Sequence, residues 1–186
     1  MIVIVDNGKN AEEISKIIRG SRITKPNHIP DADAYILTDG SNPINKDVQK
    51  HNMHFIKSNK KPVLGIGVGY LCLAMTFGAK IKTSSVSSGT EKIIIKRRSP
   101  ILLDLKKTFN VVDNQKYVIE ACPDSLGPIA SSSKYEFEII QHGSGTLGED
   151  PLPFFGVHFN PELGLDGRKI IDNFIKLVDV WNKYHK

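Results

Sequence analysis

The sequence predicts an α/β fold in which a mostly parallel central sheet is flanked by helices and extended by a small antiparallel annex. Through about the first 80 residues, short apolar runs alternate with segments of helical periodicity, which is typical of parallel strands joined by helices. After residue 78, strand-like runs follow one another with little helix between them, and short links favour antiparallel pairing. With 186 residues, 40% hydrophobic and 24% charged, we expect residues 1–186 to form one globular domain.

Each element has its own signal in the sequence. Apolar runs predict buried strands at 2–5, 34–37 and 62–66. Apolar residues at helical spacing predict helices over 11–19, with Asn10 as the N-cap, and over 46–59. Later in the chain, the same signals predict antiparallel strands at 90–96, 117–121 and 135–141, a last buried strand at 153–159, and an amphipathic helix over 168–184.

The most informative stretch is residues 62–78, PVLGIGVGYLCLAMTFG. It combines a buried strand, a turn with glycine at alternate positions, and a helix that is apolar almost all round. This order is typical of a nucleophile elbow, where a strained turn holds one reactive side chain above a sheet. The apex position is Gly67, which has no side chain to react. Glycine adopts a strained apex at little cost, so we expect a cysteine there to lower stability.

This stretch resembles the elbow of the class I glutamine amidotransferases, which reads P-hydrophobic-L-G-I-C-L-G-H-Q. The family's cysteine falls on Gly67, its histidine on Tyr70 and its glutamine on Leu71. The resemblance implies a flavodoxin-like α/β fold. It also implies descent from enzymes in which cysteine attacks the glutamine amide to form a thioester and a histidine relays the proton. The ammonia released supplies a synthetase.

A second stretch, GVHFNPE at 156–162, resembles the family's G-V-Q-F-H-P-E. The histidine that acts as general base falls on Asn160, the orienting glutamate on Glu162 and the glutamine on His158. A carboxamide has no useful pKa near neutrality, so Asn160 cannot take a thiol's proton. On a strand, residues two apart share a face, so His158 is expected to point the same way as Asn160.

A third stretch, ILTDGS at 36–41, resembles the family's I-L-S-G-G-P. That loop and the residue after the nucleophile supply backbone N–H groups to an oxyanion hole, so the resemblance implies Gly40 and Val68 as the donors. Asp39 stands where the family has glycine. An aspartate facing the pocket would repel a developing oxyanion.

These replacements predict a catalytically inactive member of the family. Removing the nucleophile of a comparable triad costs about 10⁶ in rate. The two ends of the chain, MIVIVDNG and the segment around 170–174, most resemble the stand-alone glutaminase subunit of GMP synthases. We therefore expect a subunit that docks to an ammonia-dependent synthetase or binds a small molecule over the altered site. The candidate pocket residues are Asp39, Tyr70, Leu71 and His158.

The alternative is an active amidotransferase, or a hydrolase of another substrate, that uses a different nucleophile. Cys72 lies within the apolar helix and is expected to be inert packing, and Cys122 is expected to be structural. His51 and His54 lie three apart on a helix, a spacing that a metal pair can have, but a solvent-facing interpretation is favoured. We expect no metal and no cofactor. An engineered loss of cysteine alone would not explain Asn160.

Charge and hydropathy limit the remaining classes of function. The net charge of +5 and pI of about 9.1 suit an anionic partner. The lysines are spread along the chain, however, and no aromatic residues alternate with the basic clusters at 96–98 and 106–107, so nucleic-acid binding is not expected. No apolar run approaches the roughly 20 residues of a membrane span. The N-terminus does not resemble a signal peptide, and we expect a cytoplasmic protein.

Overall fold

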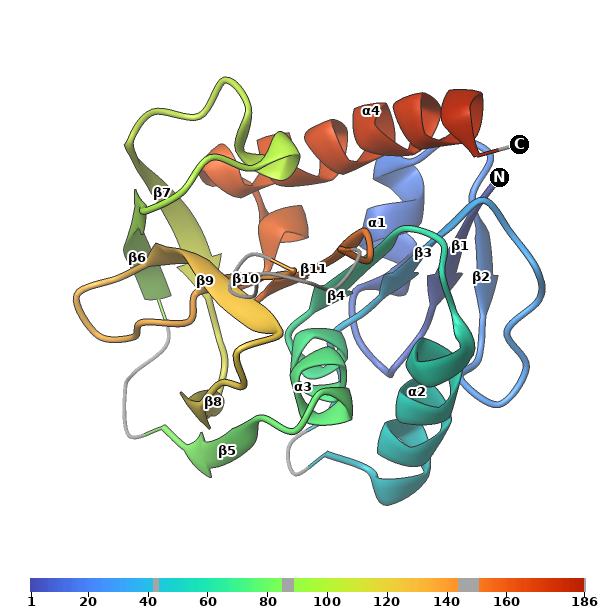
Figure 1. Ribbon diagram of the computed structural model, residues 1–186, viewed down its shortest axis with the longest axis horizontal. Coiled ribbons are helices and arrows are strands. Elements are labelled where there is room, and N and C mark those ends of the chain that lie inside the picture. The colour runs from blue at the N-terminus through green and yellow to red at the C-terminus, as the bar shows by residue number, and fades with distance from the viewer. Residues whose placement is uncertain (42–43, 85–88, 144–150, 186) are drawn as a thin grey trace.

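The central feature of the fold is one large mixed sheet. The structure is a computed structural model and describes residues 1–41, 44–84, 89–143 and 151–185 (Figure 1). In these residues nine strands form a sheet of order β2-β1-β3-β4-β11-β10-β9-β6-β7, and two more form a separate antiparallel pair, β5-β8. The run from β2 to β11 is parallel and the rest is antiparallel. The predicted fold class is confirmed.

Most of the parallel part of the sheet is deeply buried. Its strands are β1 (Ile2–Val5), β2 (Arg22–Thr24), β3 (Ala34–Leu37), β4 (Val63–Ile66) and β11 (Phe154–Val157). Four of them were predicted. The three-residue β2 was not, since its arginine and threonine give no apolar run. All residues of β1, β3, β4 and β11 are buried, as expected for strands covered on both faces.

Helices cover both faces of this sheet (Figure 1). They are α1 (Ala11–Ile17) and α4 (Arg168–Tyr184) on one face, and α2 (Lys46–Ser58) and α3 (Val68–Thr76) on the other. Alternation along β1 divides the core accordingly. Ile2 and Ile4 pack in the cluster of α1 and α4, whereas Val3 and Val5 pack in that of α2 and α3. No helix in the described ranges is long and apolar enough to cross a membrane.

The antiparallel part was predicted less completely. Its strands are β5 (Lys80–Thr83), β6 (Gly89–Ile95), β7 (Thr108–Asp113), β8 (Tyr117–Ala121), β9 (Leu126–Ser131) and β10 (Ile139–His142). The prediction found β6 and β8 and started β10 too early. It missed β5, β7 and β9. Three short 3-10 turns complete the fold: η1 (Pro100–Leu102), η2 (Pro161–Leu163) and η3 (Leu165–Gly167).

This topology places the three family-like motifs at one edge of the sheet. β3, β4 and β11 are adjacent and parallel. Asp39, Gly67 and Asn160 each follow the carboxyl end of one of these strands. In open α/β sheets, this edge is where ligands bind and reactions occur.

Candidate functional site

The elbow between β4 and α3 has the geometry of a nucleophile elbow. Gly67 has φ 52° and ψ −109°, in the region that L-residues rarely adopt. Its N–H donates to Val157 O at 3.1 Å, and the Gly69 N–H donates to Thr38 O at 3.1 Å. Backbone hydrogen bonds to the two neighbouring strand ends therefore fix the turn without any catalytic side chain.

Another side chain fills the space above the apex. A Cβ atom at Gly67 would lie 2.4 Å from Asp39 Oδ1 and 2.7 Å from Gln115 Nε2. Both distances are far shorter than a van der Waals contact. Asp39 is only 3% exposed. The carboxylate of Asp39 thus occupies the place that a nucleophile's side chain would need.

The same carboxylate is bound by the two backbone groups that the family resemblance implies as oxyanion-hole donors. The Gly40 N–H donates to Asp39 Oδ1 at 2.8 Å, and the Val68 N–H donates to the same oxygen at 3.1 Å. The two N–H groups therefore converge on one point, as an oxyanion hole requires, and the point is taken by a carboxylate oxygen. Hydrogen bonds to an ionised acceptor are about twice as strong as neutral ones.

Two carboxamides hold the other oxygen. Gln115 Nε2 donates to Asp39 Oδ2 at 3.1 Å, and Asn160 Nδ2 donates to it at 3.4 Å. Gln115 Nε2 also donates to Asn160 Oδ1 at 3.1 Å. Asn160, which the resemblance implies at the family's base position, is therefore part of a closed network around Asp39. The hydrogen bonds described to Asp39 come from neutral donors.

Glu162 completes this network. Its Oε1 accepts hydrogen bonds from Asn160 Nδ2 at 3.0 Å and from Asn10 Nδ2 at 2.5 Å. Burial raises the pKa of the Glu162 carboxyl, although the bonds from Asn10 and Asn160 act in the opposite direction. Asn10 is the N-cap residue of α1, as predicted, and its backbone carbonyl accepts from the Ile14 N–H at 3.1 Å. Its side chain makes no capping bond because it is committed to Glu162.

Tyr70 and Leu71, two of the candidate pocket residues, lie in the core. Both are buried in the cluster formed by α2 and α3. The Tyr70 hydroxyl donates to Phe137 O at 2.5 Å, and burial raises the pKa of its phenol well above the usual range. The structure therefore brings Gly67, Asp39, Gly40, Val68, Asn160 and Glu162 together and places Tyr70 and Leu71 in packing below them.

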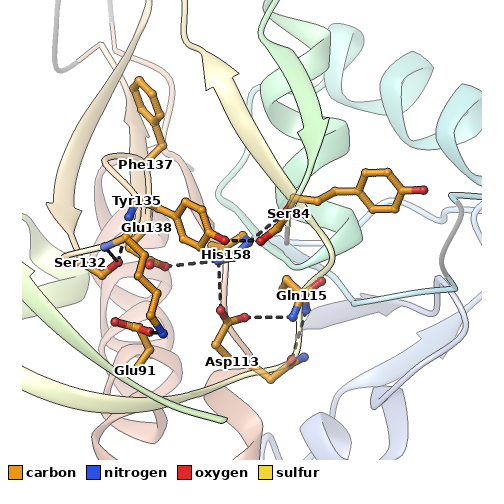
Figure 2. Close-up of polar contacts among 12 residues, drawn as sticks. Ser84, Glu91, Asp113, Gln115, Ser132, Tyr135, Phe137, Glu138 and His158 are labelled. Carbon is orange, nitrogen blue, oxygen red and sulfur yellow. Dashed lines mark hydrogen bonds and ion pairs between the residues drawn. The ribbon is translucent and has the colours of Figure 1, made fainter. Parts of the chain in front are cut away.

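His158 contacts a different set of groups from Asn160 (Figure 2). Its Nε2 lies 3.0 Å from Tyr117 O, and its Nδ1 lies 3.3 Å from Glu138 Oε2 and 3.7 Å from Asp113 Oδ2. β11 ends at Val157, so the strand alternation that would align His158 with Asn160 does not extend this far. Burial lowers the pKa of His158, but Glu138 and Asp113 outweigh it and leave the pKa raised.

Neither cysteine has the environment of a nucleophile. Burial raises the pKa of Cys72 to about 12 and that of Cys122 to about 11. The thiolate is the reactive form, so both are essentially un-ionised at neutral pH. His51 Nδ1 lies 2.7 Å from Asp47 O within its own helix. In the part of the chain that the structure describes, no three His, Cys, Asp or Glu side chains are grouped to hold a metal ion.

The sequence analysis missed four residues that shape the site. Gln115 binds Asp39 and Asn160, Asn10 binds Glu162, and Asp113 and Glu138 surround His158. One signal was available, because Phe109 and Val111 stand at alternate positions in the sequence and Asp113 continues their register, which is the buried side of β7. No local pattern identifies Gln115, which lies 76 residues from Asp39.

The chain is similar to known proteins over most of its length. The family model for glutamine amidotransferase class-I matches residues 3–177. A subunit of the glutamine-hydrolyzing GMP synthase of Methanococcus aeolicus is 26% identical over 95% of this chain and 97% of its own length. The corresponding subunit from Methanocaldococcus jannaschii is 25% identical over the same shares.

Among solved structures, a protein from Thermoplasma acidophilum that is named as a GMP synthase subunit shares the fold. The TM-score is 0.88 at 23% identity, over 98% of this chain and 96% of that one. The chain belongs to the class I glutamine amidotransferase family and, within it, resembles the glutaminase subunit of GMP synthase.

Proposed function

We propose that this protein is a non-catalytic counterpart of the GMP synthase glutaminase subunit, which docks to an ammonia-dependent synthetase without hydrolysing glutamine. The observation that carries this proposal is the position of Asp39. Its carboxylate accepts hydrogen bonds from both Gly40 and Val68, so its volume and charge exclude a tetrahedral oxyanion from that place. Gly67 has no atom that could attack the amide, and Asn160 is a hydrogen-bonded amide in place of a base.

Burial favours docking over the binding of a small molecule at the elbow. Asp39, Gln115 and Asn160 are all buried and bonded to one another. A ligand would have to displace this network and leave buried polar groups without partners, each at a cost of about 1–3 kcal/mol.

The first test is a glutamine hydrolysis assay on the purified protein, alone and with the ammonia-dependent GMP synthetase of the same organism. We expect no release of ammonia above the buffer rate in either case, a difference of about 10⁶ from an active triad. The related GMP synthase subunit from Methanocaldococcus jannaschii, assayed in parallel, serves as the positive control. Turnover that a cysteine-alkylating reagent abolishes, or a covalent glutamyl adduct in a mass spectrum, would overturn the proposal.

Exposed leucines beside the site support the docking role. Leu163 and Leu165 lie on η2 and η3, directly after Glu162, and both are solvent-exposed. Leu165 is 56% exposed and has φ 56°, an uncommon conformation for a bulky residue. Such a conformation costs about 1–3 kcal/mol and tends to occur at functional surfaces. Both follow Glu162, whose carboxylate belongs to the network around Asp39, so a partner that docks over this side of the site would cover them.

We expect Leu165→Asn to weaken binding to the synthetase at least about tenfold, or about 1.4 kcal/mol. Asparagine adopts positive φ readily, so the fold should be kept. The matched control is Val180→Asn on α4, where the side chain is 54% exposed and lies twelve residues beyond Arg168. Isothermal titration calorimetry with both variants gives the comparison. Equal affinities of the two variants for the synthetase would show that Leu165 is not part of the interface.

A further inference from the structure

A buried cluster of one imidazole and two carboxylates lies beside the site and has no part in the function proposed above. Figure 2 shows Glu138 and Asp113 approaching His158 from different sides. All three are buried, and Glu138 is 0% exposed. Neither oxygen of Glu138 has a hydrogen bond of good geometry, although His158 Nδ1 lies within 3.3 Å. Buried carboxylates in such surroundings normally need a proton or a cation.

The contacts of His158 determine where that proton is. Its Nε2 faces the Tyr117 carbonyl oxygen, which can only accept, so Nε2 must carry hydrogen. Its Nδ1 faces the carboxylates of Glu138 and Asp113, which accept when ionised. One further proton must therefore lie between Nδ1 and these oxygens, on the imidazole or on a carboxyl. Without it, a nitrogen lone pair would face two buried negative charges.

The other groups around the cluster do not replace this proton. The rings of Tyr70, from α3, and Tyr135, from the segment before β10, pack on His158 at centroid distances of 5.8 and 5.5 Å. Glu91, on β6, adds negative charge that acts on Asp113, and the Lys134 ammonium pairs with Glu91. The cluster therefore depends on the shared proton for its charge balance.

Asp113 connects this cluster to the filled oxyanion hole. Its Oδ2 faces His158, and its Oδ1 accepts the backbone N–H of Gln115 at 3.0 Å. The side chain of Gln115 in turn binds Asp39 and Asn160. A displacement of Asp113 would thus move the residue that holds Asp39 against the Gly40 and Val68 amides.

We propose that the proton shared by His158, Glu138 and Asp113 acts as a latch, which keeps Gln115 on Asp39 and opens when the proton is lost. The latch would regulate the site described in the proposed function. It rests on one part of that proposal, namely that the Asp39 carboxylate occupies the oxyanion hole. The direction of the pH effect follows from the closed state. The pKa of His158 is raised there, because Glu138 and Asp113 outweigh the effect of burial. The contribution of His158 to closure is therefore fully present below about pH 6.5 and is lost as the pH rises through its raised pKa.

Hydrogen exchange at two amides tests the latch. Val68 is the first residue of α3, so its N–H has no partner within the helix, and the bond to Asp39 is what protects it. Gly40 N–H is protected in the same way. Above about pH 6.5, we expect the protection factors of both amides, corrected for intrinsic exchange, to fall about tenfold per pH unit up to the measured pKa of His158. Leu71 N–H, bonded to Gly67 O inside α3, should keep its protection.

Three variants test whether the shared proton causes the pH dependence of amide protection. In His158→Gln the protection of Val68 and Gly40 should not change with pH. Glu138→Gln provides the same test with the imidazole present, because a neutral amide can bond to Nδ1 without a titrating proton. His185→Gln, which removes a histidine stacked on Trp181, should behave as the wild type.

A flat pH profile in the wild type, an unchanged slope in His158→Gln and Glu138→Gln, or a parallel loss at Leu71 would each overturn the latch. Ammonia release in the glutamine assay would overturn the proposed function and leave these exchange results standing. The two proposals can therefore fail separately.

Discussion

Replacing Gly67 by cysteine should destabilise the protein by about 2–5 kcal/mol, from backbone strain and overpacking together, and should not restore glutamine hydrolysis. The new Cβ would lie 2.4 Å from Asp39 Oδ1, and that carboxylate cannot move without breaking its bonds to Gly40, Val68 and Gln115. The positive φ of 52° adds strain for a residue with a side chain. Denaturant-induced unfolding of the wild type and the variant gives the difference.

A double-mutant cycle with Asp39→Gly identifies the cause of that loss. Asp39→Gly alone should also destabilise, because it leaves the buried donors around the carboxylate without their acceptor. In the double variant the cysteine gains room. The stability loss of the double variant should therefore be smaller than the sum of the two single-variant losses by about 0.5–3 kcal/mol. Gly20→Cys is the matched control for strain, since Gly20 has φ 77° and no atom within 4 Å of its added Cβ. Strictly additive losses would show that Asp39 and position 67 do not compete for space.

Gly69→Ala should be the most damaging single substitution in the elbow, costing more than about 4 kcal/mol. A Cβ at this position would lie 2.2 Å from Leu37 O and 2.7 Å from Leu37 C, and both are backbone atoms of β3. α3 would have to move away from the sheet and lose the hydrogen bond from Gly69 N–H to Thr38 O. A total stability of about 5–15 kcal/mol is typical of a domain, so the variant should be largely unfolded or poorly expressed.

Thermal unfolding followed by near-UV circular dichroism measures this effect. Gly78→Ala provides the control, because Gly78 ends the same helix with φ 96° and no atom within 4 Å of an added Cβ. It should lose only the roughly 1 kcal/mol that distinguishes alanine from glycine in a strained turn. A melting temperature of Gly69→Ala at or above that of Gly78→Ala would contradict the proposed contact with β3.

The parallel half of the fold could be predicted because burial on both faces produces continuous apolar runs. β1 and β3 begin and end where the sequence predicted. The antiparallel half has weaker signals. β9 contains Gly127 and Pro128, which normally argue against an internal strand, yet it lies between β10 and β6, with an irregularity of pairing opposite Ile139 and Ile140.

The candidate site, like the fold, could be predicted only in part. Spacing along the sequence placed Gly67 at the apex, because strand, turn and helix are local. Whether Asp39 faced the pocket depended on loop geometry, and the structure places its carboxylate directly above Gly67. Gln115 lies 45 residues from Asn160 in the sequence, and the two meet because the Asn160 N–H binds Val112 O on β7, just before the turn that carries Gln115. No local pattern could reveal this contact.

The turn at Gly67 is held by main-chain hydrogen bonds to Val157 and Thr38, and Asn160 by one from its N–H to Val112 O. None of these bonds involves a side chain that the family uses in its reaction. The shape of this sheet edge therefore requires neither a thiol at position 67 nor an imidazole at position 160. The framework alone is therefore no evidence that a gene product releases ammonia, and genome surveys need the residues at these two positions as well as the motifs around them.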